Sequence, residues 1–533
     1  MDDIRSRVRH SSGCDLGTTW SRLVGLGFET TEFICRFQVS VVCVLVLSIY
    51  GMAYDSLRDF VQKLAAAGEL KRIPVEVDPV LEITEIADRE MKLPRGGQAL
   101  LFEKCKGAQF PLLINAYGST KRMALALGVE NVDDIAQELG GLLKAKPPTS
   151  FKEAIALLGT ALELRHAKPK SVKSGPCQEV VQPGPDLAAL PIQKCWPQDA
   201  GRFICLPLVI TRDPDTGARN VGCYRMQMID GRTTFMHWQL HKTGARHWRR
   251  YRELKKRMPV AVALGGDPVY AFAATAPLPD GIDEMMLAGY LRKKSVEMVK
   301  CGTNDLEVPA DCDFVLEGYV DPEEKLDLEG PFGDHTGYYT LPEPYPKFHV
   351  ERITHRRDAV YPSTIVGMPP MEDFYMGTAS VRIFLPVFQM NFNEIVDIAL
   401  PAEGVFHNLV VVSIKKQFPY HAMKVMHGLW GMGQMMFTKI IVVVDEDVDV
   451  HNTSEVLFRL TANIDPDRDI IFTKGPADVL DHATPVMGFG SKIGIDATHK
   501  IKGEANSRAW PPIIKMDEGV KKRVDELLRH ATR

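Results

Sequence analysis

Residues 203–240 read FICLPLVITRDPDTGARNVGCYRMQMIDGRTTFMHWQL, and this stretch decides the fold class of the middle of the chain. Short apolar segments alternate in it with two turn signals, Asp213-Pro-Asp-Thr-Gly217 and Asp230-Gly231. This spacing predicts a β-meander with strands over 204–211, over 220–229 and from the second turn to about residue 240. Further strands are expected over 295–301, 313–320 and 348–354. Many short antiparallel strands in one region favour a barrel or a sandwich.

The flanking regions have the pattern of α/β structure. Before the meander, helical periodicity over 81–91, 132–143 and 151–164 alternates with short apolar strands such as 110–113. After about residue 368, largely apolar strands are expected over 409–414, 439–444 and 469–473, with helices between them. Asn452 and Glu455 form a plausible capping box for one of these helices. This alternation predicts a βαβ arrangement with a parallel sheet.

A chain of 533 residues is too long for one hydrophobic core, so several domains are expected. We predict an α/β multidomain protein with an extension over 1–51, an N-terminal α/β domain over 52–167, a central β-barrel cofactor domain over 168–367, a C-terminal α/β domain over 368–515 and a C-terminal helix over 516–533.

The composition narrows the class of partner. Hydrophobic residues make up 45% and charged residues 25% of the chain, which is typical of a soluble globular protein, and the net charge of -4 gives no electrostatic footprint for nucleic acid. A small-molecule substrate is therefore expected. The ten cysteines form no CxxC pair, which argues against a zinc knuckle or a disulfide framework and favours a reducing, cytoplasmic compartment.

The first 51 residues allow two interpretations. Residues 37–53 form a nearly uncharged run that is shorter than a spanning helix needs but resembles a signal-peptide core, so a targeting or membrane-associated segment is one interpretation. The other is that translation begins at Met52, because an amphipathic helix follows directly. Ser56 can cap this helix, apolar residues recur at i, i+3, i+4 and i+7 from Leu57, and Gly68 can end it.

One candidate for chemistry is Glu329-Gly-Pro-Phe-Gly-Asp334-His-Thr-Gly-Tyr-Tyr339. Its glycines and proline allow a loop that turns the two carboxylates towards one point. Paired carboxylates in different environments can keep one group protonated while the other stays ionised. An arbitrary Glu/Asp pair of this kind is more often a polar surface turn.

A second constellation begins with Asn220-Val-Gly-Cys-Tyr-Arg225 and continues with Met236-His-Trp-Gln-Leu-His241. An amide oxygen, an imidazole and a nearby carboxylate suit a divalent ion. Glu284 is expected in the first turn of a helix, where an acid usually interacts with the helix dipole. Taken alone, Asn220 could be a turn residue and the histidines ordinary surface or core residues. Asn220 and Arg225 are five residues apart and would face opposite sides of a regular strand, so we expect either a bulge near Gly222 or Asn220 outside the strand.

Together these segments resemble the UbiD decarboxylase family, which includes 4-hydroxy-3-polyprenylbenzoate decarboxylases and ferulic acid decarboxylases. The resemblance runs from the helix after Met52 to the end of the chain. It rests on these segments: Leu57-Arg-Asp-Phe, Gly68-Glu-Leu-Lys-Arg, Asp78-Pro-Val-Leu-Glu-Ile-Thr-Glu-Ile-Ala-Asp88, Lys300-Cys-Gly-Thr-Asn-Asp-Leu-Glu-Val-Pro309, the Glu329 to Tyr339 loop and Gly490-Ser-Lys-Ile-Gly-Ile-Asp-Ala-Thr498. It implies a central split β-barrel like that of FMN-binding flavin reductases.

The resemblance also implies functional residues. The catalytic residues would be Arg225, which orients the substrate carboxylate, Glu329, which pairs with Arg225, and Asp334, which protonates the carbon after CO2 leaves. The ligands of a manganese-type ion would be Asn220, His241 and Glu284. Residues contacting prenylated FMN would be Cys223, Tyr224, Arg225, His237, Trp238, Gln239 and Lys439. A potassium ion would lie near the main-chain oxygens of Ala273 and Ala276.

The chemistry agrees with this resemblance. Breaking a bond between an unsaturated carbon and a carboxylate leaves charge that no side chain can absorb, so a cofactor must act as electron sink. The protein supplies orientation, an anion grip and a proton donor. For acid work near neutral pH we expect a raised pKa at Asp334, through burial or the charge of Glu329.

The substrate and the partners stay open at this point. His241-Lys-Thr-Gly-Ala and the His237 position depart from the pattern of the ubiquinone enzyme, so a phenolic acid, a polyprenylated hydroxybenzoate of ubiquinone biosynthesis and a menaquinone-pathway acid are all candidates. A flavin prenyltransferase is expected to supply the cofactor, and a homo-oligomer of at least two copies is expected. The alternatives are a flavin-dependent oxidoreductase and a non-catalytic subunit of a larger decarboxylase.

Overall fold

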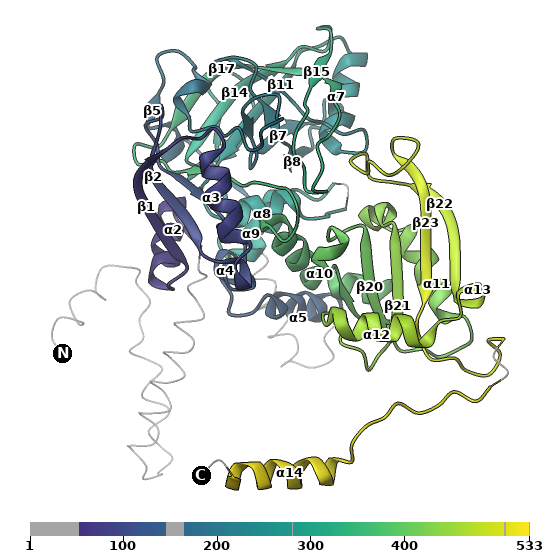
Figure 1. Cartoon of the computed structure of the whole chain (residues 1–533). Coiled ribbons are helices and arrows are strands. Elements are labelled where there is room, and N and C mark those ends of the chain that lie inside the picture. Colours follow the sequence, from purple (N-terminus) through teal and green to yellow (C-terminus); the bar gives the residue numbers. More distant parts are fainter. Residues whose placement is uncertain (1–52, 145–164, 280, 506–507, 532–533) are drawn as a thin grey trace, which may run out of the picture. The chain divides into compact units, whose positions relative to one another are not determined.

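The computed structural model describes residues 53–144, 165–279, 281–505 and 508–531 (Figure 1). The extension over 1–51, the apolar run up to residue 52 and the helix expected over 151–164 lie outside this part of the chain. The helices are α2 (Leu57–Ala66), α3 (Glu82–Met91), α4 (Thr120–Ala126), α5 (Val132–Leu143), α7 (Thr243–Glu253), α8 (Val269–Thr275), α9 (Glu284–Leu291), α10 (Glu372–Asn391), α11 (His421–Trp430), α12 (Thr453–Asn463), α13 (Pro466–Asp469) and α14 (Glu518–Ala531).

None of the helices in the described part of the chain combines the length and apolar character that crossing a membrane requires.

The helix expected after Met52 is present as α2. The Ser56 side chain accepts a hydrogen bond from the backbone N–H of Asp59, and the apolar positions that follow from Leu57 are buried. A four-stranded sheet comes next, in the order β1 (Leu70–Val77), β2 (Ala99–Cys105), β3 (Leu112–Ile114) and β18 (Tyr361–Pro362). Its last strand comes from far along the chain, so this sheet also includes residues beyond the expected N-terminal domain.

The middle of the chain forms a larger antiparallel sheet. Its strand order is β10 (Thr233–Phe235), β17 (Lys347–His355), β14 (Phe314–Val320), β11 (Met258–Leu264), β7 (Leu208–Arg212) and β8 (Arg219–Cys223), with β5 (Val180–Val181) also beside β17. The hairpin expected from the first turn signal is present as β7 and β8, but β10 lies at the other end of the sheet beside β17, so these consecutive strands do not form the predicted meander. Within the described residues the ladder runs open from β10 to β8, and its hydrogen bonds do not close it into a barrel.

The strand expected over 220–229 is interrupted, which corrects the prediction for Asn220 and Arg225. Asn220 lies inside β8, where it faces Thr211 of β7 in a regular register, so neither a bulge near Gly222 nor a position outside the strand is found. Instead β8 ends at Cys223 and the chain turns. The Tyr224 ring folds back over Gly222, where a β-carbon would lie 2.4 Å from it. Because Arg225 lies beyond the end of β8, its side chain does not follow the alternation of faces within that strand.

Smaller sheets connect the segments around this centre. They are β13 (Glu307–Pro309) with β12 (Glu297–Lys300) and β4 (Lys170–Val172), β15 (Asp327–Glu329) with β16 (Glu343–Tyr345), and β6 (Phe203–Ile204) with β9 (Met226–Gln227).

The C-terminal region forms a five-stranded sheet in the order β19 (Ile395–Ala399), β20 (Leu409–Ile414), β21 (Ile440–Asp445), β23 (Phe489–Asp496) and β22 (Ile470–Pro476). The three central strands are parallel, as expected, but β19 and β22 at the edges are antiparallel, so the sheet is mixed. The helices α11 and α12 lie beside this sheet (Figure 1). Their apolar residues pack against it in two separate clusters. The Asn452 side chain accepts the Glu455 N–H and caps α12, which confirms one half of the predicted capping box, whereas the Asn452 N–H donates to the Asp449 carbonyl oxygen instead of to Glu455.

Candidate active site

The loop that carries Glu329 and Asp334 begins at the end of β15 and is held from both sides. The Gly330 N–H donates to Gln227 Oε1 at 2.7 Å, and the Gly333 N–H donates to Asp199 Oδ1 at 2.8 Å. A β-carbon at position 333 would lie 2.2 Å from the Trp196 ring, so only glycine fits there. The sequence thus fixes the loop through its glycines and through polar side chains from distant segments.

This loop brings the two carboxylates to Arg225. The Arg225 guanidinium donates from Nε to Glu329 Oε1 at 2.9 Å and from Nη2 to Oε2 at 3.1 Å, which is a two-point grip. Its Nη1 donates to Asp334 Oδ2. The side chains of all three residues are at most 9% exposed, and the guanidinium lies 4.6 Å from the centre of the Phe332 ring. The structure therefore joins the three predicted catalytic residues in one buried ionic cluster.

His237 belongs to the same cluster, because its Nδ1 lies 3.1 Å from Glu329 Oε2. Its Nε2 is buried and has no hydrogen-bond partner within the described residues, and the same holds for the indole nitrogen of Trp238. Buried polar atoms without partners are uncommon in folded proteins and suit a site that receives a ligand. Both residues are among those predicted to contact the cofactor.

The neighbouring charges in this cluster shift the pKa values of its ionisable groups. Burial alone would raise the pKa of Glu329, but the hydrogen bond from His237 and the positive charge of Arg225 outweigh it and lower this pKa to about 2. Burial lowers the pKa of His237, and the charge of Arg225 lowers it further. In Arg225, the surrounding carboxylates outweigh burial and raise the guanidinium pKa.

Asp334 differs from the prediction. Its burial acts to raise its pKa, as expected, but the Arg225 charge and hydrogen bonds from His335 act more strongly, and the pKa lies well below its ordinary range. The expectation of a raised pKa was wrong for this arrangement, since it considered burial and the Glu329 charge and left out the cation between the two acids.

One predicted metal ligand, Glu284, contacts the strand that carries another, Asn220. Glu284 is the first residue of α9, and its Oε2 accepts the N–H of Val221, the residue after Asn220, at 2.9 Å. Burial raises the pKa of Glu284 to about 7. His241 lies in an exposed turn, with its ring 5.6 Å from the ring of Phe437, and no contact with either of the other two is found in the described structure.

The other predicted cofactor and ion residues are placed as follows. Tyr224 is buried and accepts the Gly244 N–H at 3.4 Å, Cys223 and Gln239 are half-buried, and Lys439 pairs with Asp481 at 2.6 Å. The carbonyl oxygen of Ala273 accepts the Ala276 N–H, and that of Ala276 accepts the Leu278 N–H. Both main-chain oxygens therefore already accept a hydrogen bond, and Lys439 would have to leave Asp481 to bind a phosphate.

The structure adds three residues that the sequence did not single out. His335 Nδ1 lies 2.9 Å from Asp334 Oδ1, and His335 Nε2 lies 2.7 Å from His407 Nε2. Asp478 is 3.9 Å from His407. His335 could have been noticed as the neighbour of Asp334 in the quoted motif, whereas no local pattern marks His407 or Asp478.

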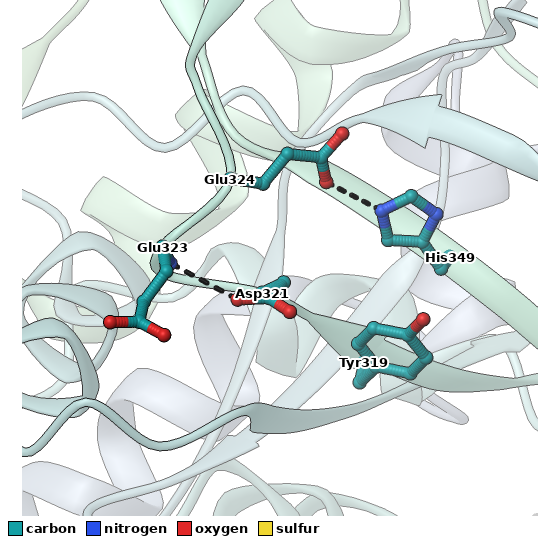
Figure 2. Close-up of a pocket in the computed structure, with 5 residues that line it drawn as sticks. All are labelled: Tyr319, Asp321, Glu323, Glu324 and His349. Carbon is teal, nitrogen blue, oxygen red and sulfur yellow. Dashed lines mark hydrogen bonds and ion pairs between the residues drawn. The ribbon is translucent and has the colours of Figure 1, made fainter.

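A surface hollow of about 450 Å³ lies elsewhere and is lined by Tyr319, Asp321, Glu323, Glu324 and His349 (Figure 2). Figure 2 shows that His349 points at Glu324, and the two are joined at 2.6 Å. None of the predicted site residues lines this hollow, so it is not part of the candidate active site.

Comparisons with known proteins show the family of this chain. The models of the 3-octaprenyl-4-hydroxybenzoate carboxy-lyases, UbiD, match residues 61–140 as the N-terminal domain, 169–369 as the Rift-related domain and 374–497 as the C-terminal domain. Uncharacterized proteins of Archaeoglobus fulgidus and Aquifex aeolicus are each 50% identical over 478 residues, which are 89% and 90% of this chain and 98% of each relative.

Solved structures are also similar to this chain over most of its length. The closed form of the vanillic acid decarboxylase of Sedimentibacter hydroxybenzoicus is 28% identical, with a TM-score of 0.77 over 89% of this chain and 99% of that one. HmfF of Pelotomaculum thermopropionicum, a UbiD-class enzyme solved in complex with prFMN, is 27% identical, with a TM-score of 0.72 over 88% of this chain and 98% of that one.

These matches identify the chain as a carboxy-lyase, an enzyme that releases CO2 from an acid. The chain belongs to the UbiD family.

Proposed function

We propose that the chain decarboxylates an aromatic or α,β-unsaturated acid without net oxidation, with prenylated FMN as cofactor. The observation that carries this proposal is the buried contact of Arg225 with both Glu329 and Asp334. A guanidinium in such a place can bind a carboxylate in two-point geometry, and two neighbouring acids offer a proton donor and a fixed counter-charge.

Each residue of the cluster then has a task. Glu329 is held at two oxygens by Arg225 and at one by His237, so it fixes the plane of the guanidinium. Asp334 contacts a different nitrogen, Nη1, through a single oxygen. A substrate carboxylate that competes for Arg225 would therefore displace Asp334 more readily than Glu329.

Displacement would also prepare Asp334 as the acid. Its low pKa depends on the Arg225 charge, so losing that contact raises the pKa of this buried group. Asp334 can then take up a proton and donate it to the substrate carbon after CO2 has left. The ionised resting state of Asp334 is thus compatible with the acid role implied by the family.

The described residues fit the expected cofactor and metal in part. Prenylated FMN would supply the electron sink that decarboxylation requires. The unpartnered nitrogens of His237 and Trp238 offer polar contacts to a ligand, and Glu284 offers a half-buried carboxylate beside the strand that carries Asn220. We propose Asn220, Glu284 and His241 as ligands of a divalent ion of the manganese type, with His241 moving in from its exposed turn.

Several finer features belong to the same proposal. We propose a split-barrel architecture for the central sheet, a potassium ion near Ala273 and Ala276, a flavin prenyltransferase as source of the cofactor, and a homo-oligomer. The seven described cysteines that are free agree with a cytoplasmic, reducing location. Phenolic acids are the first substrates to test, because a structural relative is a vanillic acid decarboxylase.

The test is to produce the full chain together with a flavin prenyltransferase, without oxygen and with manganese and potassium, and to measure CO2 release from hydroxylated benzoates and cinnamates. We expect release that disappears without the prenyltransferase and falls strongly in Asp334→Asn. Full turnover by Asp334→Asn would remove Asp334 from the acid role. Absence of modified flavin from the purified chain would contradict the cofactor proposal.

A further inference from the structure

The described part of the chain contains one cluster of three side chains with the composition of a metal site, formed by His335, His407 and Asp478. One potential ligand atom from each residue lies within 4.8 Å of the other two. None of the three belongs to the set Asn220, His241 and Glu284 that the family resemblance implies for a metal ion. The cluster therefore needs an explanation of its own.

Three separate segments supply these side chains. His335 follows Asp334 in the loop after β15, His407 precedes β20, and Asp478 follows the end of β22. The site thus connects the loop that carries the proposed acid to the edge of the C-terminal sheet where β20 begins and β22 ends. Residues so far apart in sequence meet only through the tertiary fold, so chance proximity on one loop does not account for the cluster.

The histidine geometry has the form found around bound metal ions. His335 Nδ1 lies 2.9 Å from Asp334 Oδ1, and a carboxylate that accepts the N–H of one ring nitrogen directs the other nitrogen towards a metal. That other nitrogen, Nε2, faces His407 Nε2 at 2.7 Å. Two imidazole nitrogens that face each other this closely must share either a proton or a cation.

The surrounding charges favour a cation. Asp478 and Asp481 act electrostatically on His407, and Asp373 and Asp478 act on His335, in addition to its contact with Asp334. Lys242 opposes them near Asp478, and Lys439 is paired with Asp481. Acidic groups thus outnumber the nearby ammonium groups around the two rings.

We propose that His335, His407 and Asp478 bind a divalent transition-metal ion, distinct from the ion expected at Asn220 and Glu284. Two imidazoles and one carboxylate form a ligand set for ions such as Zn²⁺, Fe²⁺, Co²⁺ or Mn²⁺ and leave positions open for water or substrate. The bound ion would tie the Asp334 loop to the C-terminal sheet. Binding does not depend on the proposed function, whereas its consequence for catalysis does.

The test uses Co²⁺, whose visible absorption reports nitrogen and oxygen ligands, titrated into the full chain after chelator treatment. The Glu284→Gln variant serves as background, so that the other expected site is weakened. In this background we expect about one bound equivalent of Co²⁺, and at least a roughly tenfold loss of affinity in His407→Ala and in the isosteric Asp478→Asn, since each removes a ligand. His451→Ala, an exposed histidine paired with Asp397, is the matched control and should bind as the background does.

Two results would overturn the proposal. One is unchanged Co²⁺ binding in both ligand variants. The other is a crystal structure grown with Zn²⁺ in which the two rings share only a hydrogen bond. Because absorption and metal content are measured without substrate, a chain that binds the ion yet releases no CO2 would contradict the proposed function and leave this site intact.

Discussion

The ionic cluster around Arg225 and the pair Asn220 and Glu284 each take one residue from the segment 220–225, but only the first contains a cation among its own members. Arg225 pairs with both Glu329 and Asp334, so each charged group of this cluster contacts a group of opposite charge. Glu284 is a half-buried carboxylate that accepts one backbone N–H from Val221, and its pKa rises to about 7 because burial outweighs this hydrogen bond and the charge of Arg219. A site whose charges compensate one another forms without its ligand, whereas a site built for an ion keeps an unbalanced group.

The largest effect is expected from Arg225→Ala. It removes the carboxylate grip and leaves Glu329 and Asp334 buried without a counter-charge, so kcat/KM should fall by about a thousandfold or more. The lost pairing should also cost roughly 3 to 5 kcal/mol of unfolding free energy. CO2 release and denaturant unfolding measure the two effects on the same preparation.

Arg225→Lys is the control for charge alone. It keeps the cation but cannot donate in parallel to both oxygens of Glu329, so it should recover much of the stability and little of the activity. Wild-type activity in Arg225→Lys would show that two-point geometry is unnecessary and would weaken the comparison between the two sites.

The next effect concerns acid stability. The folded pKa of Glu329 is about 2, below its ordinary value of 4.5, so its ionised form stabilises the fold fully above pH 4.5, and this contribution is lost as the pH falls towards 2. The shift corresponds to about 3 kcal/mol. Between these pH values Glu329→Gln should lose less unfolding free energy than the wild type, while the exposed control Glu351→Gln should follow the wild type. Parallel curves for all three proteins would refute the pairing of Glu329 with Arg225.

A smaller effect is expected at the site of Asn220 and Glu284. Glu284→Gln removes the negative charge that an ion needs, so Mn²⁺ affinity should fall by about 10- to 100-fold. Glu82→Gln is matched to it, because Glu82 is also the first residue of a helix but is exposed. Electron paramagnetic resonance of free Mn²⁺ measures both. Equal affinities would assign the ion to other ligands.

Local sequence signals predicted much of the fold. The cap at Ser56, the apolar spacing of α2 and the bounds of α5 and β20 follow from neighbours along the chain, and the structure has them as expected. The interruption of the strand at Cys223 and the antiparallel edges of the C-terminal sheet were missed, because both depend on packing between distant segments. The Tyr224 ring over Gly222 is one such contact.

The candidate site likewise contains residues that the sequence predicted and features that it did not predict. Arg225, Glu329 and Asp334 lie in motifs that the sequence displays, and the structure brings them together. The pKa shift of Asp334 was predicted in the wrong direction, because a pKa depends on which charged groups lie near one another in the folded protein. His407 and Asp478 could not be found from the sequence, since their only common feature is their proximity after folding.

The smallest expected effect is on the stability of the metal-free protein with His241→Ala. His241 is exposed and, among the described residues, makes only a ring contact with Phe437, so its removal should change the unfolding free energy by no more than about 0.5 kcal/mol. In the presence of Mn²⁺ the variant should lose the extra stability that ion binding confers on the wild type, because binding to the folded state shifts the unfolding equilibrium. Thermal unfolding with and without Mn²⁺ separates the two contributions. A large loss without metal would mean that His241 already has a structural role. Full stabilisation of the variant by Mn²⁺ would show that the ion binds without His241. The site would then need no movement of this exposed histidine.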